Sequence, residues 1–314
     1  MQPAHLTEAR PAFPADPVDE TPESADLRPP LVFWKKAFPW TVLGIGILLW
    51  CSAAAGYVLP GRAVLHYYAE SLGDEKTLLI LQEVSIRTEA PGLEERIVPE
   101  TVRYRFPGAF RSEAVFGPTR RLHLHVDGKI LTVLDENILS PGRDRFDRYK
   151  DLLLCRNREQ LERLLSRYGI QYEICSLGRF EDAVVYVLGA RYPDTSASRL
   201  VMDKEHFWPL RWIFVEGSGP STGETLEIRY NNWARIGSAW YPWRIEFYQN
   251  GELARTIRVQ SLEVNPPTPE ALFDMAALKS KVRPAQNATS NVERDAPVSD
   301  EIQKTIDAFK NMYN

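Results

Sequence analysis

The sequence lacks a strong excess of charge of either sign. Its 314 residues include 38 Lys and Arg against 42 Asp and Glu, which gives a formal net charge of -4. A domain that neutralises nucleic-acid phosphates carries a strongly basic balance or a basic stripe. The composition therefore argues against nucleic acid as a partner.

The sequence also contains few cysteines and lacks several common catalytic motifs. The chain has three cysteines, no G-K-[ST] phosphate loop and no H-E-x-x-H helix. The glycine-rich run at 216–223 lies between two predicted strands, without a following helix whose N-terminus could hold phosphate, so we interpret it as a hairpin loop. We expect a protein that is not an enzyme and has no cofactor.

A long apolar run lies near the N-terminus. Residues 37–60 are almost all apolar, two lysines precede them, and three alanines occur near their end. These are the three parts of a secretory signal peptide, and cleavage after Ala55 makes Gly56 the first residue. Uncleaved, the run is long enough to anchor the chain in a bilayer. We expect 32–60 to be a signal peptide or an N-terminal membrane anchor that contacts the membrane, and either one carries the following domain out of the cytoplasm.

The two ends of the chain differ in composition from its middle. Residues 1–31 are acidic and Pro-rich with no periodic apolar face, so we expect disorder. Residues 280–297 are interpreted as a linker, and 298–314 as a C-terminal amphipathic helix with one apolar stripe. The domain between these segments spans 61–279, which is long enough for one large core.

Alternating apolar and polar residues dominate this domain and predict half-buried strands. The dipeptides Asp127-Gly128 and Asn250-Gly251 predict two-residue hairpin turns, because both positions tolerate positive φ. The predicted strands are 77–87, 101–106, 110–116, 121–126, 129–134, 183–189, 198–203, 210–216, 226–230, 242–248 and 254–264. Aromatic residues of both parities between Trp240 and Tyr248 predict that both faces of that part of the sheet are apolar.

Two helices are expected within the domain. Residues 62–72 have apolar positions at helical spacing and end before Gly73. Residues 151–168 bring their leucines toward one side and end before Gly169, which predicts one long helix covering a face of the sheet.

Two pairs of side chains are candidate sites. His123 and His125 share a face of one strand and can supply two metal ligands, but no third ligand is evident, so we expect no metal and a polar strand face instead. Cys155 and Cys175 can form a disulfide in an oxidising compartment, and the alternative is two buried thiols.

The closing part of the domain resembles a known family. Residues 200–273 contain the segments WPLRW, RYNNW, WYPWRIEF and LEVNPPTPEALFD, in which Asn265 ends the last strand and Leu272 and Phe273 follow it. This pattern, with the opening helix and strand at 62–87, resembles the outer-membrane lipoprotein-sorting family of periplasmic proteins, LolA-like or LolB-like.

The resemblance implies a mainly β (α+β) fold, an unclosed antiparallel β-barrel or half-barrel with helices in or over its concave face. It implies a non-enzymatic carrier that binds acyl chains of lipids or lipoproteins in a hydrophobic cavity. The alternative is an envelope regulatory or scaffold module that binds a protein partner. Six inward residues are the expected lipid-binding positions, namely Tyr104, Phe106, Trp212, Phe214, Ile245 and Phe247.

Overall fold

The computed structural model describes residues 58–87, 96–138, 145–216 and 224–282. The expected N-terminal tail, the Ala55–Gly56 cleavage site and the C-terminal helix lie outside these ranges, as do nearly all of the apolar N-terminal segment and of the linker. Within the described ranges, no helix combines the length and the apolar character needed to cross a bilayer.

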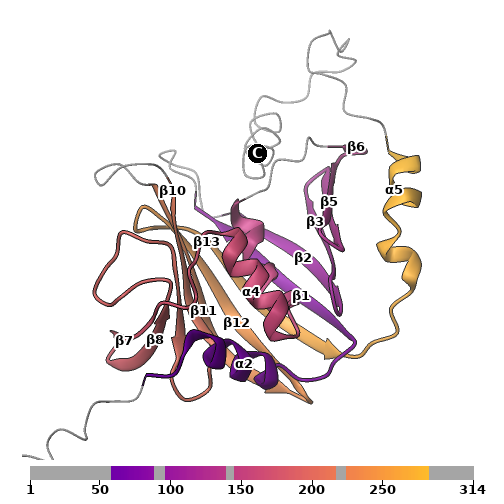
Figure 1. The fold of residues 1–314 in the computed structure, drawn as a ribbon. Coiled ribbons are helices and arrows are strands. Elements are labelled where there is room, and N and C mark those ends of the chain that lie inside the picture. Colours follow the sequence, from indigo (N-terminus) through magenta and orange to yellow (C-terminus); the bar gives the residue numbers. More distant parts are fainter. Residues whose placement is uncertain (1–57, 88–95, 139–144, 217–223, 283–314) are drawn as a thin grey trace, which may run out of the picture. The chain divides into compact units, whose positions relative to one another are not determined.

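The described strands form one sheet in which every neighbouring pair is antiparallel (Figure 1). The strands are β1 Thr77–Ile86, β2 Arg96–Arg105, β3 Ala109–Phe116, β4 Thr119–Val126, β5 Lys129–Leu134, β6 Asn137–Ile138, β7 Cys175–Phe180, β8 Ala183–Leu188, β9 Arg199–Asp203, β10 Pro209–Glu216, β11 Glu224–Ile236, β12 Ala239–Gln249 and β13 Glu252–Val264.

The order of the strands leaves the sheet open. It runs β6-β5-β4-β3-β2-β1-β13-β12-β11-β10-β9-β8-β7, so β6 and β7 are its edges and do not pair with each other. The first strand pairs with the last, from Leu78 opposite Val264 to Ile86 opposite Arg255. The unclosed antiparallel half-barrel expected from the sequence is confirmed.

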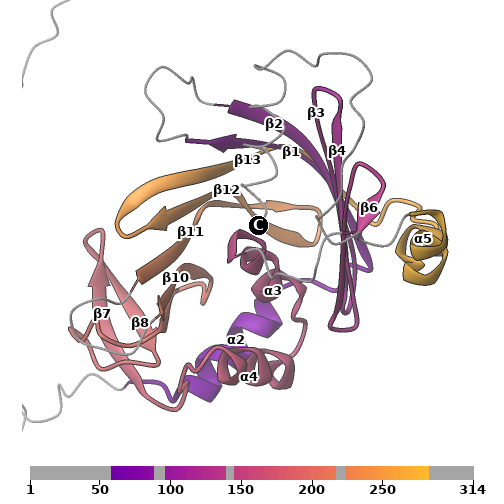
Figure 2. The ribbon, with the colours of Figure 1, turned by 90° about the horizontal axis from the view of Figure 1, so that it is seen from above.

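Irregular pairing bends this sheet. The register shifts at Leu81/Gln82 in β1 and at Phe247/Tyr248 in β12, and Asn232 in β11 has a φ of 55° and no partner in β12. The two register shifts are β-bulges, which increase local twist and bend a strand. Figure 2 shows the result, a sheet that curves around the helices α2, α3 and α4.

The helices lie on both sides of the sheet. Within its concavity are α2 Gly61–Ser71, the 3-10 helix η2 Arg145–Arg148, α3 Tyr149–Leu154 and α4 Arg158–Arg167 (Figure 2). The C-terminal part of the domain adds η3 Glu270–Phe273 and α5 Met275–Lys281. Phe273 packs with Leu124 and Leu131 in a second apolar cluster, so this segment covers the outer face of β3 to β5.

The prediction of one long helix at 151–168 is wrong. The chain leaves the helical conformation at Cys155, whose ψ is 136°, and re-enters it after Asn157. The side chain of Asn157 caps the new helix by accepting a hydrogen bond from the backbone N–H of Gln160 at 2.9 Å. Two short helices therefore meet at an angle over the sheet, where one straight helix was expected.

The local predictions that rest on turn chemistry are confirmed. Asp127 and Gly128 join β4 to β5 with φ of 49° and 81°, and Asn250 and Gly251 join β12 to β13 with φ of 51° and 85°. The structure also has a short strand that the sequence did not predict, β6, and extends β11 six residues beyond Tyr230.

Candidate functional site

The six residues expected to bind lipid meet in one apolar cluster on the concave face, called here the concave cluster. It comprises Tyr104, Phe106, Trp212, Phe214, Ile245 and Phe247. Five of them are at most 3% exposed, and Phe106 is partly buried against the others. Trp212 and Phe214 on β10, and Ile245 and Phe247 on β12, share the inward face because side chains on a strand repeat every two residues. Tyr104 lies near the end of β2, and Phe106 follows that strand.

Three short elements cover this cluster, and we call η2, α3 and α4 the helical cover. Tyr149 of α3 packs edge-to-face on Phe247, with ring centroids 6.0 Å apart. Tyr168, just after α4, packs in the same way on Trp212 and Phe214, each at 5.2 Å. The cover therefore contacts the sheet through aromatic side chains, which bury large apolar areas in specific geometries.

Tyrosine hydroxyls add polar contacts between the cover and its surroundings. Tyr230 of β11 donates to the backbone oxygen of Tyr149 at 3.0 Å, and Tyr68 of α2 lies 3.4 Å from the backbone oxygen of Leu152. Burial raises the pKa of Tyr149 and Tyr230 well above the usual value, so both hydroxyls stay protonated and can donate.

A buried charge network fastens the cover to the other side of the concavity. Arg121 of β4 donates from Nη2 to Oδ2 of Asp147 in η2 at 2.7 Å, and its Nη1 lies 3.8 Å from Oε1 of Glu100. Gln82 donates to the second oxygen of Glu100 at 2.6 Å. Lys150, 2% exposed, donates to the backbone oxygen of Asp147 at 2.8 Å. The sequence analysis missed this network, although Arg121 occupies an inward position next to His123 on the same strand face.

The two strand histidines do share a face, as their spacing predicts, and both point toward the cover. Nδ1 of His123 lies 2.9 Å from Oγ1 of Thr132 and 3.3 Å from Oδ2 of Asp147, whereas Nδ1 of His125 lies 4.0 Å from Oδ1 of Asp151. Burial lowers the pKa of His123 well below its usual value, so its ring is neutral. Among the residues that the structure describes, no three His, Cys, Asp or Glu side chains gather as metal ligands.

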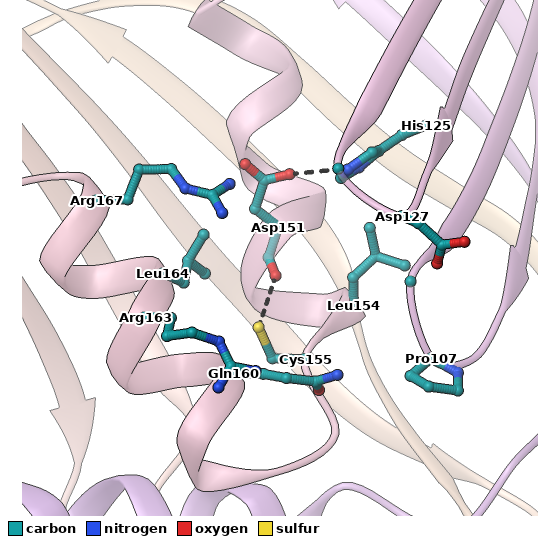
Figure 3. A pocket seen from close by; sticks show the side chains of 12 residues that line it. Pro107, His125, Asp127, Asp151, Leu154, Cys155, Gln160, Arg163, Leu164 and Arg167 are labelled. Atoms are coloured by element: carbon teal, nitrogen blue, oxygen red, sulfur yellow. Dashed lines mark hydrogen bonds and ion pairs between the residues drawn. The ribbon is translucent and has the colours of Figure 1, made fainter.

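A groove of about 410 Å³ opens beside the cover, between α3, α4 and the turns that follow β2 and β4 (Figure 3). Leu154 and Leu164 line it and are also members of the apolar core that contains the concave cluster. Arg163 and Arg167 extend from α4 into the groove beside Leu164, and Asp151 lies at the centre of the groove (Figure 3). Charged side chains and members of the apolar core therefore line the same groove.

Cys155 and Cys175, the cysteines of the described ranges, are free thiols in this structure. Burial raises the pKa of Cys155 to about 12 and that of Cys175 to about 11. Cys155 lies on the wall of the groove, where its Sγ is 3.3 Å from the backbone oxygen of Asp151. Because the thiolate is the reactive form, neither cysteine is suited to nucleophilic chemistry at neutral pH.

The glycine-rich run contains Gly219-Pro220-Ser221-Thr222-Gly223, which matches the letters of a G-x-S-x-G nucleophile motif. It lies outside the described residues. The strands on either side of it, β10 and β11, pair antiparallel with Glu216 opposite Glu224. A nucleophile elbow joins a strand to a helix, so the flanking topology is that of a hairpin and not of this motif.

Comparison with known proteins finds similarity only among solved structures. No protein-family model matches the chain, and no curated protein matches it. A putative outer membrane lipoprotein-sorting protein domain from Vibrio parahaemolyticus is 13% identical over 69% of this chain and 97% of its own, with a TM-score of 0.47. A LolA superfamily protein from Nitrosomonas europaea is 14% identical over 70% of this chain and 99% of its own, with a TM-score of 0.49.

A further similar structure is the MucA/MucB complex of Pseudomonas aeruginosa, at 13% identity over 69% of this chain and 62% of that one, with a TM-score of 0.27. The assignment of architecture rests on the chain's own strand order and on the helices in its concavity. On these grounds the described residues form an open antiparallel half-barrel.

Proposed function

We propose that this chain is a non-enzymatic periplasmic carrier that binds acyl chains of lipids or lipoproteins beneath its helical cover. The observation that carries the proposal is that Leu154 and Leu164 line the groove and also belong to the core around the concave cluster. An acyl chain entering the groove thus meets apolar surface that continues into the half-barrel.

An acyl chain can replace the apolar contacts that the helical cover makes with the sheet. The cover packs on the sheet through apolar and aromatic side chains, which gain about 25 cal/mol per Å² of apolar surface removed from water. If α3 and α4 shift outward, the acyl chain replaces their apolar contacts with equivalent ones. The concave cluster then exchanges one apolar neighbour for another and is not exposed to water.

One polar atom in the concave cluster also suits a lipid ester. Trp212 is fully buried, and its Nε1 has no hydrogen-bond partner among the described residues. A buried donor without an acceptor costs about 1–3 kcal/mol. The carbonyl oxygen of an acyl ester can accept from this N–H while its chain lies along Phe214 and Phe247.

The proposal is tested with the purified protein, stripped of lipid and then incubated with phospholipid vesicles. Native mass spectrometry is expected to find bound phospholipid, and a fluorescent fatty acid is expected to bind saturably. Leu164→Gln places an amide in the groove and should weaken binding, whereas Leu81→Gln, at a 46% exposed position outside the groove, should not. Wild-type protein that never carries lipid contradicts the proposal.

The alternative, a scaffold that binds a protein partner, is separated from the carrier by deleting residues 298–314. A carrier retains or increases its lipid uptake after this deletion. A scaffold that uses this segment loses its partner and shows no lipid uptake before or after. The mass of the mature protein distinguishes a released chain from an anchored one. A chain that starts at Gly56 is released into the periplasm, whereas a retained Met1 indicates an anchored chain.

A further inference from the structure

A second cavity, called here the outer cavity, lies on the opposite face of the sheet from the concave cluster. It has a volume of about 700 Å³ and is bordered by the turns that follow β7 and β9 and by strands β11 and β12. In β12, Ile245 and Phe247 point into the core, and the alternate residues Arg244, Glu246 and Tyr248 line the outer cavity. The expectation of an apolar outer face in this region is wrong, because β12 also places charged side chains there.

Stacked rings form one wall of the outer cavity. The ring of Trp208 lies 4.4 Å from that of His206 at an interplanar angle of 19°, and 5.5 Å from that of Trp233 at 21°. All three line the cavity, and Trp240 packs against Trp208 at 4.5 Å from outside the lining. Trp233 also packs against the buried core, and the four rings together form a partly exposed aromatic group of the kind that marks a binding surface.

The opposite wall is polar and centred on Glu246, which is 7% exposed. Its Oε1 accepts from Nε of Arg244 at 2.9 Å, and its Oε2 accepts from Nδ2 of Asn231 at 3.0 Å and lies 3.3 Å from the hydroxyl of Tyr248. The guanidinium of Arg229 lies over the ring of Tyr248, 4.2 Å from its centroid. Planar side chains with several donors and acceptors are thus held in fixed positions by one another.

The pairing of these charges restricts the ligand. Glu246 is paired with Arg244, and Arg229 with Glu227, so the polar wall does not attract a strongly ionic ligand. Glu181 and Asp203, which also line the cavity, disfavour an anion. An acyl chain is also excluded, since it would cover charged and amide groups without satisfying their hydrogen bonds, at a cost of several kcal/mol. The cavity offers a ligand ring faces and edges on one wall. On the other wall it offers groups that accept and donate hydrogen bonds.

We propose that the outer cavity binds a neutral saccharide. A pyranose ring has an apolar face of C–H groups that packs on the exposed faces and edges of the His206, Trp208 and Trp233 rings. Its hydroxyls each donate and accept, which matches the amide of Asn231, the carboxylate of Glu246 and the guanidinium of Arg244. A volume of about 700 Å³ accommodates more than one sugar unit, so the ligand is an oligosaccharide.

The test titrates the whole protein with three neutral probes: maltohexaose, cellohexaose and the hexamer of N-acetylglucosamine. Binding is followed by intrinsic tryptophan fluorescence and by calorimetry. At least one probe is expected to bind saturably. Trp208→Ala and Trp233→Ala are each expected to weaken that binding by about tenfold or more.

Two further variants keep the test decisive. Asn231→Ala removes a polar contact at a strand position and leaves the rings in place. It is expected to weaken binding, and it supplies the measurement if a tryptophan variant fails to fold. Tyr192→Ala removes a 52% exposed aromatic ring outside the outer cavity, and binding is expected to be unchanged. Lipid uptake by Trp208→Ala should equal that of the wild type, which separates this site from the groove.

Three outcomes overturn the proposal. The first is the absence of saturable binding for all three saccharides up to millimolar concentration. The second is binding that is equally strong in the folded Trp208→Ala, Trp233→Ala and Asn231→Ala variants. The third is binding of a proline-rich peptide, a ligand class that also docks on aromatic grooves, more tightly than any of the three saccharides.

Discussion

Arg121 in β4 and Asp147 in η2 form an ion pair inside the protein, with Nη2 and Oδ2 2.7 Å apart and the side chains 1% and 9% exposed. The two residues come from elements on opposite sides of the concavity, so this pair fastens the helical cover to one arm of the half-barrel. Burying both charges costs solvation, and the pair stabilises the fold only as long as both partners remain.

Replacing Asp147 by Ala is therefore expected to lower the free energy of unfolding by about 3–5 kcal/mol, because it leaves a buried guanidinium without its closest carboxylate. The double variant Arg121→Met/Asp147→Leu removes both charges and is expected to recover part of the loss, because it also takes the Arg121 guanidinium away from the buried carboxylate of Glu100. Urea denaturation followed by circular dichroism measures both. A double variant no more stable than Asp147→Ala would contradict this account of the pair.

The strands and tight turns were predictable because they depend on neighbours in sequence. Alternation of polar and apolar residues specifies a strand, and Asp127-Gly128 and Asn250-Gly251 specify turns through backbone conformation alone. The inward set that includes Trp212 and Phe214 follows from the same period. None of these inferences requires knowledge of a distant contact.

The buried charges were not predictable, because their partners are distant in sequence. Arg121 and Asp147 are 26 residues apart, and their pairing depends on where η2 docks. The break between α3 and α4 was missed for another reason. Leucines continue at helical spacing on both sides of it, and that periodicity masked the capping signal at Asn157.

The stability of the protein is expected to fall as the pH drops below about 6.5, and His123 is the main cause. Burial lowers the pKa of His123 in the folded state, with Lys150 and Arg121 acting in the same direction and Asp147 opposing them. The unfolded chain therefore binds a proton below about pH 6.5 that the folded chain does not. The contribution of His123 is complete above that pH and decreases by up to about 1.4 kcal/mol per pH unit below it.

Urea denaturation between pH 7 and pH 5 checks this slope. His123→Gln should flatten it, and His66→Gln should not, because His66 has a half-exposed side chain on the surface of α2. Equal slopes in the two variants would assign the effect to other groups.

Below about pH 4 a second loss of stability is expected from Asp147. Burial alone would raise the pKa of that carboxyl, but Arg121 and the other cations around it lower the pKa below the unfolded value.

Cys155 and Cys175 are expected to react slowly with thiol reagents in the native protein. Burial raises the pKa of Cys155 to about 12 and that of Cys175 to about 11, so little thiolate forms at pH 8. Ellman's reagent should detect these two thiols at an ordinary rate only after unfolding in urea. The measurement uses protein in which Cys51 is absent through signal cleavage or replaced by Ser. If no thiol is detected in urea until a reductant is added, the two cysteines form the disulfide that the sequence leaves open.

The short helices α3 and α4 give a prediction whose sign distinguishes two helices from one. Asn157 caps α4 by accepting from the backbone N–H of Gln160, and the side chain of Gln160 accepts from the backbone N–H of Arg156 at 2.7 Å. Asn157→Ala removes the cap and should destabilise the protein by about 1 kcal/mol, while Asn157→Asp keeps an oxygen there and should be nearly neutral. In one continuous helix, Ala would instead be the better residue at this position and would stabilise it. Thermal denaturation of the two variants beside the wild type therefore decides the question, and a more stable Asn157→Ala protein would show that the helix runs through.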